Sequence, residues 1–134
     1  MCGDQKFFLC EHCGNLIGLI EDSGVEIYCC GEPMTYLEPN TVDASREKHV
    51  PVASIEDNTI SVKIGSDPHP MIEAHYISWI YLQTQNGGQR KCLKIAAEPE
   101  ARFTVIDDTP VAAYAYCNLH GLWKTVVFTG ANNK

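Results

Sequence analysis

The sequence lacks any apolar run long enough to span a bilayer, and Met1 to Lys6 has neither the basic nor the apolar region of a signal peptide. It has no cluster of lysine and arginine, and its net charge of -7 argues against nucleic acid as the partner. No segment has the periodicity of a helix of normal length. These absences predict a cytoplasmic, all-β protein that binds neither membrane nor nucleic acid.

Cysteine, by contrast, is abundant, with seven in 134 residues. In a reducing compartment so many cysteines indicate metal ligands or free thiols rather than disulfides. Four of them form two tight pairs, Cys10 with Cys13 and Cys29 with Cys30. This spacing is typical of a tetrahedral four-sulfur site, which accepts either iron or zinc. The segment around it is too short to fold alone, so we expect the metal to supply much of its folding free energy.

Strand signals recur along the whole chain. Alternation of apolar and polar residues with a period of two predicts antiparallel strands, and the chain divides into a segment of residues 1–37 and a segment of residues 38–134. In the strand that begins at Ile77, the side chains of Ile77, Trp79 and Tyr81 are expected on one face. The predicted strands are Lys6 to Leu9, Val25 to Tyr28, Ile60 to Ile64, Ile77 to Tyr81, Phe103 to Val105 and Val111 to Tyr116. The pattern predicts a sandwich or barrel in the second segment.

Four of the five histidines, and a fifth cysteine, fall in the second segment. They are His49, His69, His75, His120 and Cys117. Cys117 and His120 have a Cys-x-x-His spacing, which lets a thiolate and an imidazole bind one ion. These ligand types suit iron, zinc or copper. Five ligands exceed a closed zinc site and would leave an octahedral ion one open position, as a reactive centre requires.

At the level of motifs the chain resembles the superoxide reductases, specifically the two-iron desulfoferrodoxin form. Five motifs carry this resemblance in the same order along nearly the whole chain. They are Cys10-Glu11-His12-Cys13-Gly14-Asn15, Cys29-Cys30-Gly31-Glu32-Pro33-Met34, Glu47-Lys48-His49-Val50-Pro51-Val52, His69-Pro70-Met71 with His75 and Ile77-Ser78-Trp79-Ile80, and Tyr116-Cys117-Asn118-Leu119-His120-Gly121-Leu122-Trp123.

The resemblance implies a desulforedoxin-like Fe(Cys)4 domain over residues 1–37, followed by an immunoglobulin-like, seven-stranded superoxide reductase domain over residues 38–134. It implies that His49, His69, His75 and His120 bind the second iron, with Cys117 as the axial thiolate. Glu47 matches the carboxylate that caps the open position in the resting state, and Lys48 the lysine that faces the incoming anion.

By the same resemblance the reaction is the one-electron reduction of superoxide to hydrogen peroxide, which detoxifies superoxide without releasing dioxygen. The iron would be re-reduced by a rubredoxin-type donor, and the protein would be a homodimer. Four neutral imidazoles and one thiolate leave Fe(II) a local charge of +1, so superoxide would meet a positive site on an acidic protein.

Three positions depart from the family pattern. Ala74 stands where relatives often carry a lysine before the third histidine, which leaves more of the steering to Lys48. Cys2 and Cys92 match no ligand position, and Cys92 is expected to be a partly exposed free thiol.

Other interpretations of the sequence remain open. The four N-terminal cysteines could hold structural zinc, and Glu47 and Lys48 could be an ordinary solvated pair. The whole chain could be an electron-transfer module without turnover, or a zinc-ribbon interaction protein.

Overall fold

The computed structural model describes residues 3–127, so Cys2 lies outside the described part. Contacts divide the chain between Glu38 and Pro39 into two compact units, a smaller N-terminal one and a larger C-terminal one.

Short strands joined by tight turns build the N-terminal unit. Its three-stranded antiparallel sheet has the order β2-β1-β5, with β1 at Lys6–Leu9, β2 at Leu16–Leu19 and β5 at Thr35–Tyr36. A second hairpin pairs β3, Tyr28–Cys29, with β4, Glu32–Pro33. In this unit Phe7 and Cys10 are the buried apolar side chains among the described residues. So small a core agrees with a unit that depends on a metal.

The strand predicted at Val25 to Tyr28 is largely wrong. Only Tyr28 of that segment lies in a strand, and Val25 is 75% exposed. Gly24 precedes it in the left-handed region, at φ +85°. An apolar residue with nothing to pack against gives a strand no stabilising face, so the chain crosses this stretch as a loop.

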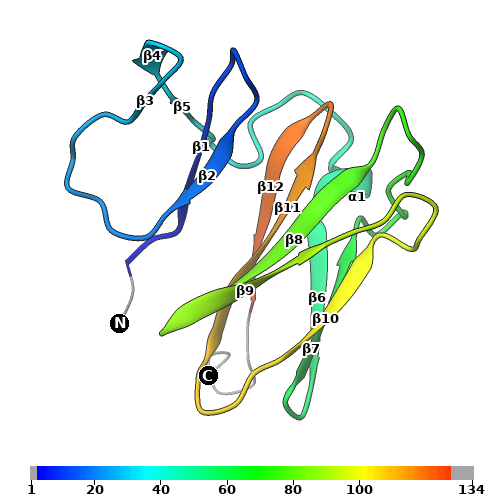
Figure 1. Cartoon of the computed structure of the whole chain (residues 1–134). Coiled ribbons are helices and arrows are strands. Elements are labelled where there is room, and N and C mark those ends of the chain that lie inside the picture. The colour runs from blue at the N-terminus through cyan, green and yellow to red at the C-terminus, as the bar shows by residue number, and fades with distance from the viewer. Residues whose placement is uncertain (1–2, 128–134) are drawn as a thin grey trace. The chain divides into compact units, whose positions relative to one another are not determined.

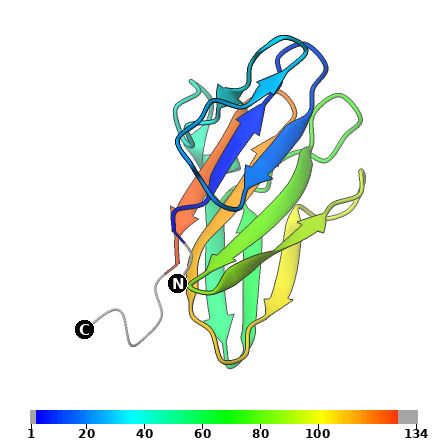
Figure 2. The same cartoon turned by 60° about the vertical axis from the view of Figure 1, so that its left-hand side comes forward.

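Residues 39–127 form a sandwich of seven strands in two sheets (Figures 1 and 2). One sheet has the order β10-β7-β6 and the other the order β12-β11-β8-β9, and all pairings are antiparallel. The strands are β6 Pro51–Glu56, β7 Thr59–Ile64, β8 Ile77–Thr84, β9 Gly87–Cys92, β10 Glu100–Thr104, β11 Pro110–Cys117 and β12 Gly121–Val126. The predicted all-β class, with a cysteine-rich knuckle and a seven-stranded sandwich, is confirmed.

The core lies between the two sheets. In β7 the alternation predicts the inner face correctly, because Ile60, Val62 and Ile64 are all at most 1% exposed. Removing such side chains from water contributes roughly 2 kcal/mol each. The sheet opposite supplies core residues from β8 and β11, among them Ile77, Ile80, Leu82, Ala113 and Ala115.

A β-bulge in β8 overturns one prediction about faces. Cys117 pairs with Ile77 and Tyr116 with Trp79, so Ser78 is an extra residue on β8. The inserted residue reverses the alternation, so the core takes Ile77, Ile80 and Leu82. Trp79 instead stacks on Tyr116, with ring centroids 5.9 Å apart. Ile77 and Trp79 therefore do not share a face.

The helix of the described residues is a single turn, α1, at Arg46–His49. It directly precedes β6 and ends at a buried histidine. Between residues 3 and 127 no helix reaches the length and apolarity that crossing a membrane requires.

Candidate metal centres

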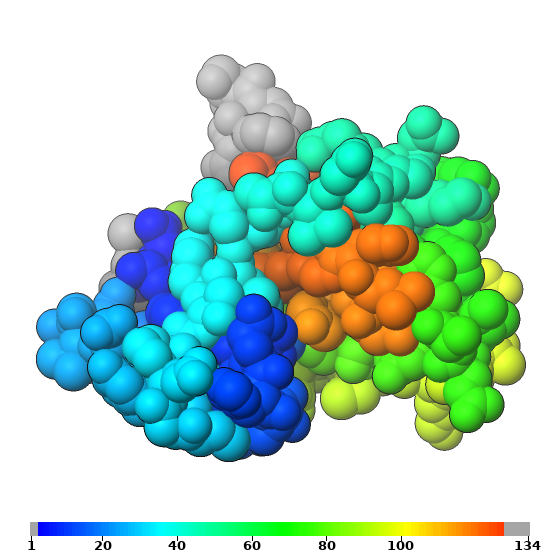
Figure 3. Space-filling model, turned by 90° about the horizontal axis from the view of Figure 1, so that it is seen from above, coloured from blue at the N-terminus to red at the C-terminus, as the bar shows by residue number. Residues whose placement is uncertain are grey.

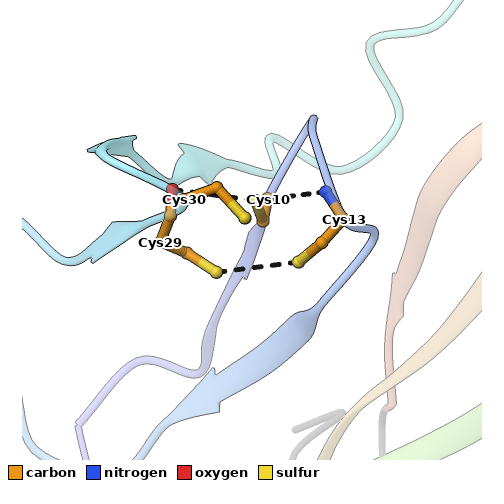
Figure 4. Close-up of side chains that lie close together, drawn as sticks. All are labelled: Cys10, Cys13, Cys29 and Cys30. Carbon is orange, nitrogen blue, oxygen red and sulfur yellow. Dashed lines mark hydrogen bonds between the residues drawn. The ribbon is translucent and has the colours of Figure 1, made fainter.

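Two turns of the N-terminal unit bring four thiols together (Figure 4). Cys10 and Cys13 lie between β1 and β2, and Cys29 and Cys30 lie at the end of β3 and in the turn that follows. The four sulfur atoms lie within 4.8 Å of one another. Sγ of Cys13 is 3.7 Å from Sγ of Cys29. These separations match what one ion with sulfur ligands at about 2.3 Å requires.

Adjacent cysteines can face the same point only if the backbone turns sharply between them. Cys30 does so by adopting φ +54°, in the left-handed region that non-glycine residues rarely occupy. The strain of this conformation is consistent with a metal-binding role, because such outliers persist where the surroundings hold them.

Backbone and side-chain amides surround the sulfur atoms. The N–H of Cys13 donates to Sγ of Cys10 over 3.5 Å, and the N–H of Asn15 donates to Sγ of Cys13 over 3.4 Å. The bond from Cys13 lowers the pKa of Cys10 to about 6, whereas bonds to neighbouring thiols, that of Cys13 first, raise the pKa of Cys30 to about 12. The four thiols therefore do not all ionise together on their own. A bound cation would allow it, because its positive charge offsets the repulsion among four thiolates.

Three segments of the sandwich unit meet at one end of it. In Figure 3 the orange segment that contains the β11–β12 turn lies between the turquoise segment with α1 and the green loop before β8. His49 comes from α1, His69 and His75 from the β7–β8 loop, and Cys117 and His120 from the end of β11 and the turn after it. Ligand atoms of His49, His69, His75 and Cys117 lie within 4.8 Å of one another.

His120 lies beside this group. Its Nδ1 is 3.1 Å from Nε2 of His49 and 3.9 Å from Sγ of Cys117. The structure thus gathers all five residues that the sequence assigned to one centre, although they are spread over 72 positions of the chain.

Backbone carbonyls orient two of the imidazoles. Nδ1 of His49 lies 2.6 Å from the carbonyl oxygen of Ser45, and Nδ1 of His69 lies 2.7 Å from that of Pro70. A carbonyl only accepts, so each Nδ1 carries the proton and each Nε2 presents a lone pair. Those two Nε2 atoms lie 3.2 Å apart. Two lone pairs at this distance repel unless a cation lies between them.

The remaining atoms of the cluster also fit a metal. Among the buried side-chain nitrogen and oxygen atoms of residues 3–127, Nε2 of His75 is the one that has no hydrogen-bond partner. Leaving such an atom unpaired costs about 1–3 kcal/mol, and a bound ion would remove this cost. Four imidazoles and one thiol suit a borderline or soft transition metal, and they do not suit Mg²⁺ or Ca²⁺.

Burial sets the protonation of the cluster. It lowers the pKa of His49 and of His75, and it lowers the pKa of His69 to about 4. The imidazoles of His49, His69 and His75 are therefore neutral at physiological pH, which is the form that binds a metal. Burial also raises the pKa of Cys117, so this thiol would release its proton only when a cation binds.

Four other residues singled out from the sequence are exposed to solvent or half-buried. Glu47 and Lys48 lie in α1 directly before His49, where Glu47 is exposed and Nζ of Lys48 is 2.7 Å from Oδ2 of Asp67. Cys92 is an exposed free thiol, as predicted. Ala74 is exposed in the loop before His75.

The sequence analysis did not identify Asn118, which joins the turn that carries Cys117 and His120 to the segment that carries His75. Oδ1 of Asn118 accepts the N–H of Tyr76 over 2.9 Å, and Nδ2 of Asn118 donates to the carbonyl of Ala74 over 3.1 Å. This amide ties the Cys117–His120 turn to the backbone on both sides of His75. Its only sequence signal is its place inside the Cys-x-x-His motif.

The fold and the two clusters define a metal-binding β-protein with a four-thiol centre and an imidazole–thiol centre. The family model for desulfoferrodoxin matches residues 41–126. The chain is 46% identical to the desulfoferrodoxin homolog of Archaeoglobus fulgidus over 90% of this chain and 96% of that one. It is 42% identical to the desulfoferrodoxin of Nitratidesulfovibrio vulgaris over 92% and 98%. The chain belongs to the desulfoferrodoxin family.

A solved structure agrees with this assignment over both units. The superoxide reductase of Treponema pallidum has a TM-score of 0.78 and 37% sequence identity. The match covers 92% of this chain and 99% of that one. The resemblance predicted from the motifs is confirmed.

Proposed function

We propose that this protein is a superoxide reductase with two iron centres. The observation that carries the proposal is the imidazole–thiol cluster, to which His75 contributes a ring nitrogen, and in which the buried Nε2 of His75 has no hydrogen-bond partner. The similar solved structure from Treponema pallidum is that of a superoxide reductase, which supports the same activity.

The second centre would be held by the five residues gathered in the sandwich unit. His49 and His69 would bind through Nε2, because their Nδ1 atoms face carbonyl groups. His120 would bind through Nδ1, the atom nearest to His49 and Cys117. His75 would use its unpaired Nε2, and Cys117 would supply the thiolate.

These five residues would hold an iron ion that supplies one electron to superoxide, and we propose a rubredoxin-type protein as the external electron donor. With two protons, that electron converts superoxide to hydrogen peroxide, and no dioxygen is formed. The ammonium group of Lys48 would attract the anion toward the centre. Glu47 would supply a carboxylate ligand to the iron in the resting state.

The N-terminal unit would be a desulforedoxin-like iron domain of residues 1–37, held by Cys10, Cys13, Cys29 and Cys30. The reductase domain would cover residues 38–134. We further propose a homodimer that acts in the cytoplasm in the detoxification of superoxide. Iron rather than zinc in the four-thiol centre would let that centre take part in electron transport.

The decisive experiment is metal analysis and visible spectroscopy of protein purified without oxygen, before and after addition of ferricyanide. Two irons per chain, with a thiolate-to-iron band that appears on oxidation, are expected. Pulse radiolysis should then reveal a second-order oxidation by superoxide. Cys117→Ser should lose that band, while Cys92→Ser, which removes an exposed thiol outside both clusters, should keep it.

A protein that holds only zinc and stays colourless after reconstitution with iron would refute the proposal. An iron-loaded protein that superoxide does not oxidise would instead be an electron-transfer module.

A further inference from the structure

Lys48, the lysine proposed to attract superoxide, is already paired with a carboxylate. Its Nζ lies 2.7 Å from Oδ2 of Asp67, and the two side chains are 43% and 58% exposed. Ion pairs this exposed contribute little to the stability of a protein. The consequence of the pair is therefore electrostatic, because it places a negative charge against the cation that would attract the anion.

The backbone holds the two partners together. The N–H of Asp67 donates to the carbonyl of Glu47 over 3.0 Å, and the hydroxyl of Ser66 donates to the same oxygen over 3.4 Å. The loop that carries Asp67 is thus joined to α1 through bonds that do not involve the carboxylate.

Gly65 makes this approach possible. At φ +86° it lies so close to α1 that a Cβ atom would be 2.7 Å from the carbonyl oxygen of Lys48 and 2.8 Å from that of Glu47, and it would also collide with the carbonyl of Asp67. Only glycine fits there without a shift of the backbone. Asp67 is therefore fixed beside Lys48 by the fold.

We propose that Asp67 restrains the anion-attracting lysine, so that superoxide must compete with this carboxylate for the Lys48 ammonium group. The inference rests on the function proposed above. Since Ala74 supplies no second cation at the loop before His75, the Lys48–Asp67 pair would set much of the local potential met by an incoming anion. Asp67 would be a positioning residue that acts through Lys48.

The ion pair can be tested without turnover. Trace labelling of amines, read by mass spectrometry, should label Lys48 faster in Asp67→Asn than in the unchanged protein. Lys6 offers a matched control, because its Nζ is also 2.7 Å from a carboxylate, that of Asp22, with side-chain exposures of 39% and 40%. Asp22→Asn should speed the labelling of Lys6 and leave Lys48 unchanged. Equal labelling of Lys48 with and without the Asp67 carboxylate would overturn the proposal.

The effect on the reaction is tested by pulse radiolysis of the iron-loaded protein. Asp67→Asn should raise the second-order rate constant with superoxide about threefold at low ionic strength and steepen its decline with added salt. Glu56→Gln makes the same change in net charge in an exposed side chain at the far end of β6, and should leave the rate unchanged.

The outcomes separate the two proposals. A rate that stays the same or falls in Asp67→Asn refutes the restraint, whatever the labelling shows. A protein that does not react with superoxide at all refutes the proposed function, while the labelling still decides whether Asp67 holds Lys48.

Discussion

The indole ring of Trp123 stacks on the imidazole of His49, with ring centroids 4.8 Å apart and planes 28° apart. The same side chain donates its Nε1–H to the carbonyl of His120 over 3.1 Å, and it is fully buried. One residue of β12 thus supports two of the proposed ligands. Because neither contact involves a ligand atom, it acts on the orientation of the rings.

Trp123→Phe should keep an aromatic ring against His49 and lose the bond to His120. The carbonyl left without its donor should lower the free energy of unfolding by about 1 kcal/mol, measured by urea denaturation of the metal-free protein. The thiolate-to-iron band of the loaded protein should also shift, because the His120 ring is less firmly held.

Phe103→Leu is the control, since it alters a buried aromatic side chain in the core strand β10. It should lower stability and leave the band in place. A band that moves equally in both variants would contradict a specific role for Trp123.

Asn118→Ala should loosen the turn that carries Cys117 and His120. Both side-chain bonds to the segment around His75 are lost, so we expect affinity for the metal at this centre to fall about tenfold, as when other supporting hydrogen bonds are removed. Competition with a chromophoric chelator measures this affinity. Asn58→Ala removes an exposed amide from the β6–β7 turn and should not change the affinity for the metal. If it lowers that affinity as much as Asn118→Ala does, the two side-chain hydrogen bonds of Asn118 are unimportant for metal binding.

Cys13→Ser should empty the four-thiol centre and leave the imidazole–thiol centre loaded. With so small an apolar core, the N-terminal unit should then unfold, while the sandwich keeps its own core of buried side chains. Limited proteolysis, with metal analysis of the resistant fragment, checks both statements. Cys92→Ser should leave both centres intact, and a sandwich that is lost along with the first metal would show that the units do not fold independently.

Asp108 should make stability depend on pH at the acid end. Hydrogen bonds from the Thr84 side chain and then from backbone N–H groups, including those of Thr109 and Asn86, lower the pKa of this carboxyl. Because the folded-state pKa lies below the unfolded value, this contribution is present above about pH 4 and is lost as the pH falls through the folded pKa.

Urea denaturation of the metal-free protein at a series of pH values measures how steeply the free energy of unfolding changes with pH. Asp108→Asn should be less stable than the unchanged protein near neutral pH and should lose less stability on acidification. Asp107→Asn, which removes the neighbouring carboxylate, should keep the original slope. Parallel slopes for the unchanged protein and Asp108→Asn would contradict the assignment.

The sequence predicted most of what is local in this protein. The cysteine pairs are short-range motifs, and β7 alternates apolar and polar residues without interruption. Both could therefore be recognised from the spacing of residues along the chain. In β8 the same spacing predicted the wrong face for Trp79, because the inserted Ser78 reverses the alternation. Only the pairing of β8 with β11 reveals this bulge. The sequence pattern also gives no sign of the Lys48–Asp67 pair. Its members are 19 positions apart and meet because Gly65 lets the loop that carries Asp67 approach α1.

The two centres differ in how much chain must be assembled before a metal can bind. The four thiols span 21 residues and come from two neighbouring turns, so they can meet as soon as the N-terminal segment leaves the ribosome. The imidazole–thiol ligands join α1, the β7–β8 loop and the β11–β12 turn, so they meet only once both sheets are formed. Metal loading should therefore be sequential, with the second ion captured only after the sandwich has folded. A supply of the wrong metal early in synthesis would then affect the first centre and spare the second.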